Sequence, residues 1–78
     1  MGKKNSKPKP GTKVVLEKLP PGLLEGLLAS DQRAIKRIVG KPVHLLEYDE
    51  LGRAELEFMD KNGNVHSIWV GPEFIRQW

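Results

Sequence analysis

Acidic side chains lie close together in the second half of the chain, where they could support acid–base chemistry. Glu47, Glu55 and Glu57 fall in segments that alternate polar and apolar residues. Two carboxylates can act as general acid and general base when a fold places them around one substrate. A tight turn would make Glu47 and Glu55 cross-strand neighbours. The sequence offers no nucleophile or pocket-forming insertion beside them, so we interpret these carboxylates as a solvated acidic surface.

The two histidines, His44 and His66, are the candidate ligands for a metal ion. In a regular strand register they flank Phe58 at one end of the predicted sheet. A zinc site needs three or four ligands, and this register brings no third residue to them. The chain has no cysteine that could supply a thiolate. We therefore expect no metal and no other cofactor, and we interpret both histidines as residues at the rim of the fold.

Basic residues form a third group that could bind a ligand. Arg33, Lys36, Arg37 and Lys41 would form one patch able to contact phosphates. Barrel-type nucleic-acid binders usually display aromatic residues for base stacking, and this patch has none. A solvent-exposed helix face is therefore our first interpretation, with contact to nucleic acid kept as the alternative.

The basic character of the chain is concentrated at its beginning. The net charge of the 78 residues is +3, and Lys3, Lys4, Lys7 and Lys9 contribute four positive charges, so the remaining residues carry a net charge of −1. Residues 1–11 are rich in lysine, proline and small polar residues, which favours a disordered tail. We expect one domain over residues 12–78.

Large aromatic residues can anchor a protein interface, and Trp69 is the candidate here. The predicted strands place Trp69 beside Glu55 on the acidic side of the sheet. Tyr48 and Phe74 are expected to pack in the core. No Ser-His-Asp arrangement, phosphate-binding glycine loop or nucleotide fingerprint occurs, so we do not expect this chain to be an enzyme.

The first half of the chain predicts one strand and one helix. Residues 12–19 are rich in β-branched and aliphatic residues and end at Pro20-Pro21-Gly22. Residues 22–29 hold four leucines and are expected to form an irregular buried flap. Ser30 is the predicted N-cap of a helix that ends at Gly40. At 100° per residue its apolar stripe comprises Ala34, Ile35, Ile38 and Val39.

Two Asp-x-x-Gly turns, beginning at Asp49 and Asp60, predict three-residue hairpin loops with glycine in the left-handed conformation. With regular alternation, the apolar face contains the rows Leu46–Leu56–Ile68, Tyr48–Ala54–Val70 and His44–Phe58–His66. The other face alternates Val43, Leu45, Met59, Val65 and Trp69 with Glu47, Glu55, Glu57 and Ser67. After Gly71-Pro72, a short last strand is expected to pair with the first strand and close a barrel.

The segment Trp69-Val70-Gly71-Pro72-Glu73-Phe74-Ile75 resembles the strand, one-turn helix and final strand of SH3 domains. The pattern over residues 12–75 resembles the SH3-like β-barrel superfold, including small bacterial SH3-like modules and barrels that are subunits of larger enzymes. The resemblance implies a mainly β fold, a small five-stranded barrel with one short helix inserted between the first and second strands. Peptide-binding SH3 domains also share an aromatic-rich segment and a tryptophan pair that form grooves for proline-rich ligands. Both are missing here, so the resemblance does not extend to proline-peptide binding.

These observations favour a non-catalytic interaction module that binds another protein. The candidate contact residues are Trp69, Glu55, Glu57, Arg33, Lys36, Arg37 and Lys41. The alternatives are a nucleic-acid-associated barrel that uses the lysine tail and the helix patch, and an accessory subunit of an enzyme complex. No segment approaches the roughly 20 apolar residues needed to span a bilayer, and the lack of cysteine suits the cytoplasm. The sequence does not indicate whether the chain is a monomer or an oligomer.

Overall fold

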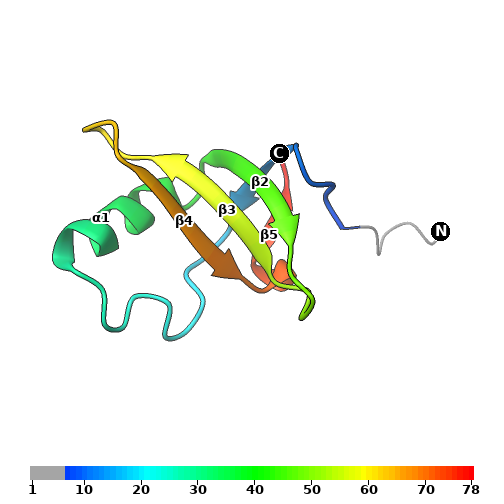
Figure 1. Cartoon of the computed structure of the whole chain (residues 1–78), viewed down its shortest axis with the longest axis horizontal. Coiled ribbons are helices and arrows are strands. Elements are labelled where there is room, and N and C mark those ends of the chain that lie inside the picture. The colour runs from blue at the N-terminus through cyan, green and yellow to red at the C-terminus, as the bar shows by residue number, and fades with distance from the viewer. Residues whose placement is uncertain (1–6) are drawn as a thin grey trace.

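Five antiparallel strands form one twisted sheet in the order β4-β3-β2-β1-β5 (Figure 1). The computed structural model describes residues 7–78. Its elements are β1 (Lys13–Leu16), α1 (Ala29–Ile38), β2 (Pro42–Tyr48), β3 (Ala54–Met59), β4 (Val65–Val70), the 3-10 turn η2 (Pro72–Phe74) and β5 (Ile75–Gln77). The mainly β architecture with a helix between β1 and β2 is thus confirmed. No helix in the described range is long and apolar enough to cross a membrane.

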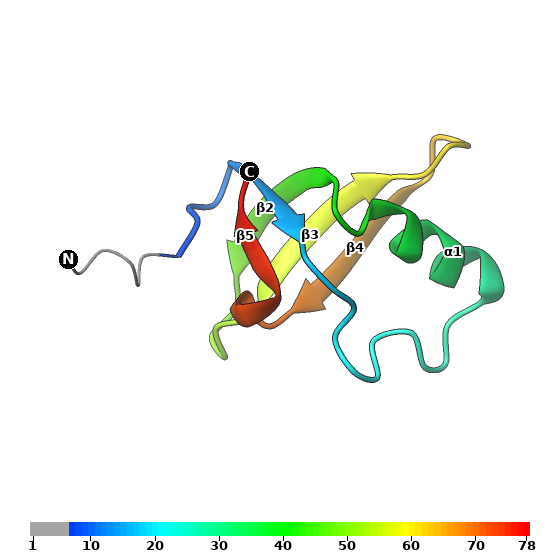
Figure 2. The same cartoon turned by 180° about the vertical axis from the view of Figure 1, so that it is seen from behind.

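The predicted closure of a barrel is not found. β5 pairs with β1, as expected, with Leu16 opposite Ile75. The two edges of the sheet, β4 and β5, share no hydrogen-bonded ladder. The sheet instead curls so that β1 and β5, together with α1 at one end, lie on the viewer's side of β3 and β4 in Figure 2.

The two hairpins form as predicted because each aspartate organises its own turn. The Asp49 carboxylate accepts hydrogen bonds from the backbone N–H groups of Leu51 and Arg53, at 3.0 and 2.8 Å. The Asp60 carboxylate does the same in the second turn. Gly52 and Gly63 have φ values of 83° and 87°, in the left-handed region that favours glycine. These contacts are local in sequence, and they set the pairing of the flanking strands.

A β-bulge at Leu46 changes which residues of β2 face the core. The pairing moves from Glu47 opposite Glu55 to Leu45 opposite Leu56, so Leu46 is the extra residue. Regular alternation predicted Leu46 inside and Leu45 outside, and this was wrong. Leu45 is fully buried, whereas Leu46 is 39% exposed. The bulge also turns Val43 into the core, because one extra residue reverses the faces of the strand before it.

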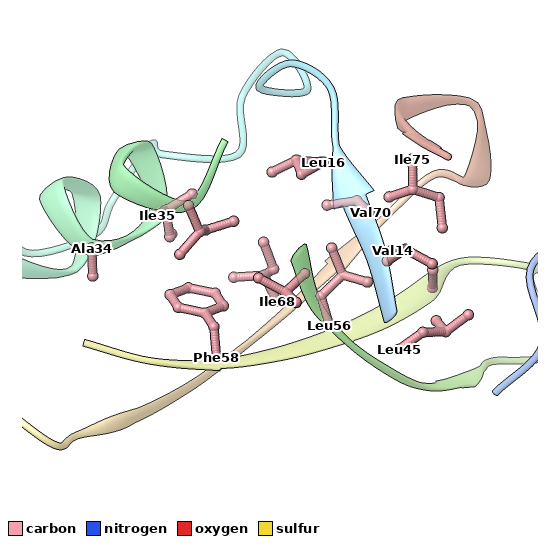
Figure 3. Packing of buried hydrophobic residues seen from close by; sticks show 13 residues of the cluster. Val14, Leu16, Ala34, Ile35, Leu45, Leu56, Phe58, Ile68, Val70 and Ile75 are labelled. Carbon is pink, nitrogen blue, oxygen red and sulfur yellow. The ribbon is translucent and has the colours of Figure 1, made fainter. Parts of the chain in front are cut away.

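The helix packs its predicted apolar stripe onto the sheet. Ala34, Ile35 and Ile38 are buried, and Ala34 and Ile35 lie above Phe58 of β3 (Figure 3). The helix begins at Ala29 with Leu28 in the N-cap position, so the prediction of Ser30 as the N-cap was wrong. Ser30 lies within the first turn instead.

The C-terminal end of the helix is tied to the sheet by the backbone. Gly40 follows the helix end with a φ of 85° and donates its N–H to the Leu16 carbonyl at 2.9 Å. The C-cap is Val39, one residue before the predicted C-cap Gly40. The last turn of the helix is held beside β1, which fixes the direction in which β2 begins.

The core lies between β2, β3 and β4 on one side and β1, β5 and α1 on the other (Figure 3). It consists of Val14, Leu16, Ala34, Ile35, Ile38, Val43, Leu45, Ala54, Leu56, Phe58, Ile68, Val70 and Ile75. The flap before the helix was predicted to be buried, but it divides into two parts. Leu23 and Leu24 pack against the core, whereas Leu27 and Leu28 are exposed. The turn at Gly26, with a φ of 78°, separates these two pairs.

Residues 7–11 of the predicted tail lie against the sheet. The Tyr48 hydroxyl donates a hydrogen bond to the Pro8 carbonyl at 2.7 Å, and the Lys7 ammonium lies 4.7 Å from the centre of the Tyr48 ring. The Gly11 N–H donates to the Leu45 carbonyl at 2.8 Å. Burial raises the pKa of Tyr48. Lys3 and Lys4 of the predicted tail lie outside the described residues.

Candidate functional site

The face of β2, β3 and β4 that points away from α1 carries most of the candidate contact residues, and we refer to it as the outer face. It is formed by His44, Leu46, Glu47, Glu55, Glu57, Met59, Val65, Ser67 and Trp69, which are exposed or half-buried. The sequence placed Trp69 beside Glu55, and the strand register confirms this pairing. It also confirms Glu47 opposite Glu55.

Trp69 lies beside a hollow at the end of the outer face. The hollow has a volume of about 510 Å³ and is lined by Asp49, Glu50, Leu51, Arg53 and Trp69. Trp69 is 37% exposed and Leu51 is 76% exposed. The Arg53 guanidinium lies 5.8 Å from the centre of the indole ring, within cation–π range. Two large apolar side chains therefore meet solvent at this hollow.

Acidic groups adjoin this apolar surface on one side. Glu55 lies opposite Trp69, and its carboxylate accepts a hydrogen bond from the Ser67 hydroxyl at 3.0 Å. Glu50 lines the hollow, and Glu47 and Glu57 are further carboxylates on the outer face. The carboxylates of the outer face therefore lie on the β2 and β3 side of Trp69, and the open edge of β4 is on its other side.

Arg53 is held in place by Asp49. Its guanidinium Nε lies 2.7 Å from the Asp49 carboxylate. Partial burial tends to raise the pKa of Asp49, but the hydrogen bonds from Arg53 and from the Leu51 N–H outweigh that effect, so this pKa lies below its ordinary value. The ion pair holds the Arg53 guanidinium beside the Trp69 ring, while the Arg53 side chain remains 53% exposed.

The opposite end of the outer face opens into a second groove of about 460 Å³. The ladder between β2 and β3 ends at His44 opposite Glu57, and the first two residues of β2 pair only with β1. Met59 and Val65 are exposed here, next to Pro42. The groove thus lies where β2 separates from β3.

Three of the four candidate basic residues lie on the helix, and the fourth, Lys41, lines the groove at the end of the outer face. Arg33, Lys36 and Arg37 are exposed on α1 opposite its buried stripe, and Lys41 follows the helix. Arg33 and Arg37 line a small hollow of about 110 Å³ together with Lys61 and Asn62 of the β3–β4 turn. Within residues 7–78, none of the four forms an ion pair with a carboxylate.

The two histidines do not come together, which corrects the predicted row with Phe58. The bulge at Leu46 places His44 on the outer face opposite Glu57. His66 lies on the inner side, stacked on Phe58 with a distance of 5.3 Å between ring centres. Among the described residues, no three histidine or carboxylate side chains are arranged to hold a metal ion.

His66 joins the helix to the second hairpin. Its Nε2 lies 2.9 Å from the Asp60 carboxylate, and its Nδ1 lies 3.8 Å from the Asp31 carboxylate. The hydrogen bond from His66, followed by those from the backbone N–H groups of Asn64 and Asn62, lowers the pKa of Asp60 to about 2. His66, Asp60 and Asp31 therefore link the helix to the end of the sheet.

Several residues of these surfaces were missed in the sequence. Glu50, Leu51 and Arg53 line the hollow at Trp69, and Lys61 joins the helix patch. Leu51 had a usable signal, since a leucine at the tip of an Asp-x-x-Gly turn has no core to enter. Arg53 and Lys61 carried none, because surface charges next to turns are common.

Comparisons of the chain with known protein families, with curated proteins and with solved structures found no significant match.

Proposed function

We propose that this chain is a non-catalytic module that binds another protein through its outer face, with Trp69 as the anchor. The observation that carries the proposal is the position of Trp69, half-exposed beside a hollow that it shares with the exposed Leu51. Tryptophan is enriched among the few residues that dominate protein interfaces. A side chain of a partner that entered the hollow would cover both apolar groups.

The charges around the hollow indicate the chemistry of the partner. Glu55 lies opposite the anchor and Glu50 lines the hollow, with Glu47 and Glu57 further along the outer face, whereas Arg53 is already paired with Asp49. Complementary charge increases the association rate and excludes partners of the same sign. We therefore propose a partner surface with an apolar side chain flanked by lysine or arginine.

The arrangement of the strands supports a further part of the proposal, that the fold is an open variant of the SH3-like barrel. The strands β2, β3 and β4 are joined by two tight hairpins, and a 3-10 turn precedes a last strand that pairs with β1. The inserted helix and flap replace the segment that SH3 domains use for proline-rich ligands. The outer face is then the surface that remains for a partner.

The test is a comparison of two tryptophan variants in a binding assay. Partners are captured from nuclease-treated extract on the immobilised chain, and one that binds directly is purified and titrated. Trp69→Ala should weaken its binding by at least about 30-fold, the loss expected for an interface hot spot. Trp78→Ala is the matched control, because Trp78 is also exposed but lies after β5.

Stability must be measured in parallel, since Trp69 contacts Glu55 and Arg53. Both variants should show the circular dichroism spectrum of the folded chain. Equal binding by the two variants would refute the proposed anchor, and so would a Trp69→Ala chain that binds normally. Glu55→Gln with Glu57→Gln should lower the association rate at low salt, while a rate unchanged by both substitutions would refute the basic partner.

One observation favours a second candidate function, contact with nucleic acid through the helix. Arg33 and Arg37 adjoin Lys61 at the small hollow, where three basic side chains outnumber the one carboxylate, Asp60, which is held by His66. Affinity for a DNA or RNA oligonucleotide should then fall steeply with salt, and Arg33→Gln with Arg37→Gln should reduce the slope of log affinity against log salt by about one to two. Binding that is absent or insensitive to salt would exclude this function.

A further inference from the structure

The outer edge of β4 is the longest strand edge that the sheet leaves open. No backbone hydrogen bond among residues 7–78 joins β4 to any segment other than β3. The Asp60 N–H donates to the Asn64 carbonyl, so the backbone groups of Asn64 point toward β3. Because these directions alternate along a strand, the backbone groups of Val65, Ser67 and Trp69 point away from the sheet.

This edge lacks the features that prevent strand pairing in other proteins. Exposed edges are commonly protected by lysine, proline, a bulge or a very short strand. β4 has six residues, contains no proline, lysine, arginine or carboxylate, and keeps an unbroken register with β3. At the other edge, β5 has three residues and includes Arg76, whose guanidinium lies 3.0 Å from the Glu17 carboxylate. Only one of the two edges is therefore suited to accept another strand.

We propose that β4 pairs antiparallel with β4 of a second copy of this chain, on a two-fold axis at Ser67. This register places Ser67 opposite Ser67 and Val65 opposite Trp69, so that all three outward-pointing residues of each strand are used. Aromatic–β-branched pairs across a ladder are stabilising. The proposal goes beyond the binding of a partner on the outer face, because it rests on backbone groups at the edge.

The same register places no charged side chains opposite each other, because β4 contains no lysine, arginine or carboxylate. The edge is thus complementary to itself, which is what a symmetric dimer needs.

The geometry at Ser67 offers a direct test. Each chain presents Ser67 at the two-fold axis, so a charged residue substituted there lies opposite the same charged residue of the second chain. Ser67→Lys and Ser67→Glu should each weaken the dimer by roughly tenfold, since like charges directly opposite are destabilising. An equimolar mixture of the two variants should restore the dimer. Sedimentation equilibrium from micromolar to millimolar concentration measures the dimer dissociation constant of each variant and of the mixture.

Controls separate association from folding and from partner binding. Ser67→Thr keeps a neutral β-forming residue at the axis and should dimerise like the original chain. Circular dichroism should show that both charged variants are folded, and restored association in the mixture would itself demonstrate this. Trp69→Ala removes the proposed partner anchor but leaves the backbone edge, so it should dimerise with no more than a severalfold loss.

Three results would overturn the proposal. The first is a chain that remains monomeric at millimolar concentration, which would leave the edge to a different protein. The second is a dimer that neither charged variant weakens, which would place the interface elsewhere. The third is a mixture that stays as monomeric as its two components.

Hydrogen exchange gives a separate test of the interface. In the dimer, the amide hydrogens of Val65, Ser67 and Trp69 should exchange more slowly than in the monomer, which is present in dilute solution.

Discussion

The bulge at Leu46 predicts that two adjacent leucines contribute very differently to stability. Leu45 is fully buried opposite Leu56, in the middle of the core, whereas Leu46 is 39% exposed on the outer side of β2. Leu45→Ala should therefore lower the free energy of unfolding far more than Leu46→Ala does. Regular alternation along β2 predicts the opposite order, so the two variants test the bulge itself.

The size of the difference follows from burial. Replacing a fully buried leucine by alanine removes its transfer free energy and leaves a cavity, which together cost about 2–5 kcal/mol. Substitution at a partly exposed site such as Leu46 should cost less than about 1 kcal/mol. The two variants should therefore differ by at least about 1 kcal/mol, and because 1 kcal/mol lowers the Tm of a domain of this size by about 4–8 °C, they should differ in Tm by at least about 4 °C.

Urea unfolding followed by circular dichroism measures both free energies. The urea midpoint should fall strongly for Leu45→Ala and little for Leu46→Ala, with similar slopes if both variants keep the same fold. If Leu45→Ala is already unfolded without denaturant, the milder substitutions Leu45→Val and Leu46→Val replace it. The loss of unfolding free energy should again be larger at Leu45 than at Leu46. A larger loss at Leu46 than at Leu45 would refute the bulged register.

Two further predictions concern single hydrogen-bonded groups. The pKa of Asp60 in the folded chain, about 2, lies below its ordinary value of 3.8, so its contribution to stability is complete above about pH 4 and is lost as the pH falls toward 2. Urea unfolding between pH 5 and 2 should show this loss, which Asp60→Asn should lack; an identical loss in both chains would contradict the assignment. Tyr48→Phe removes the hydrogen bond to Pro8 and should cost about 1 kcal/mol. Exchange of the Gly11 amide hydrogen should become faster, and unchanged exchange would show that Tyr48 does not hold residues 7–11.

Local chemistry explains which parts of the fold could be predicted from the sequence. Asp49 and Asp60 form their turns with side-chain contacts to residues two and four positions later, so the hairpins and the β3–β4 register follow from a few neighbouring residues. The helix stripe depends only on helical periodicity. The position of Trp69 beside Glu55 followed from the same turn geometry, which is why the centre of the candidate site was found.

The remaining parts depend on contacts that are distant in sequence. Leu45 and Leu46 are the same residue type, so alternation could place either one in the core, and pairing of Val43 with Val14 of β1 decides between them. Barrel closure likewise depends on how far the whole sheet coils. The hollow beside Trp69 needed Leu51 and Arg53, and the ion pair that brings Arg53 over the indole ring could not be distinguished from ordinary surface charges in the sequence.

The central claim is that the outer face at Trp69 contacts another protein, and site-specific photo-crosslinking tests it most directly. A photoreactive amino acid replaces Leu51, which is 76% exposed beside Trp69, or Lys36 on the helix as a matched exposed control. Irradiation in nuclease-treated extract should give a discrete protein adduct from position 51, which Trp69→Ala should abolish, and none from position 36. Equal adducts from both positions, or an adduct at position 51 that survives Trp69→Ala, would contradict the account.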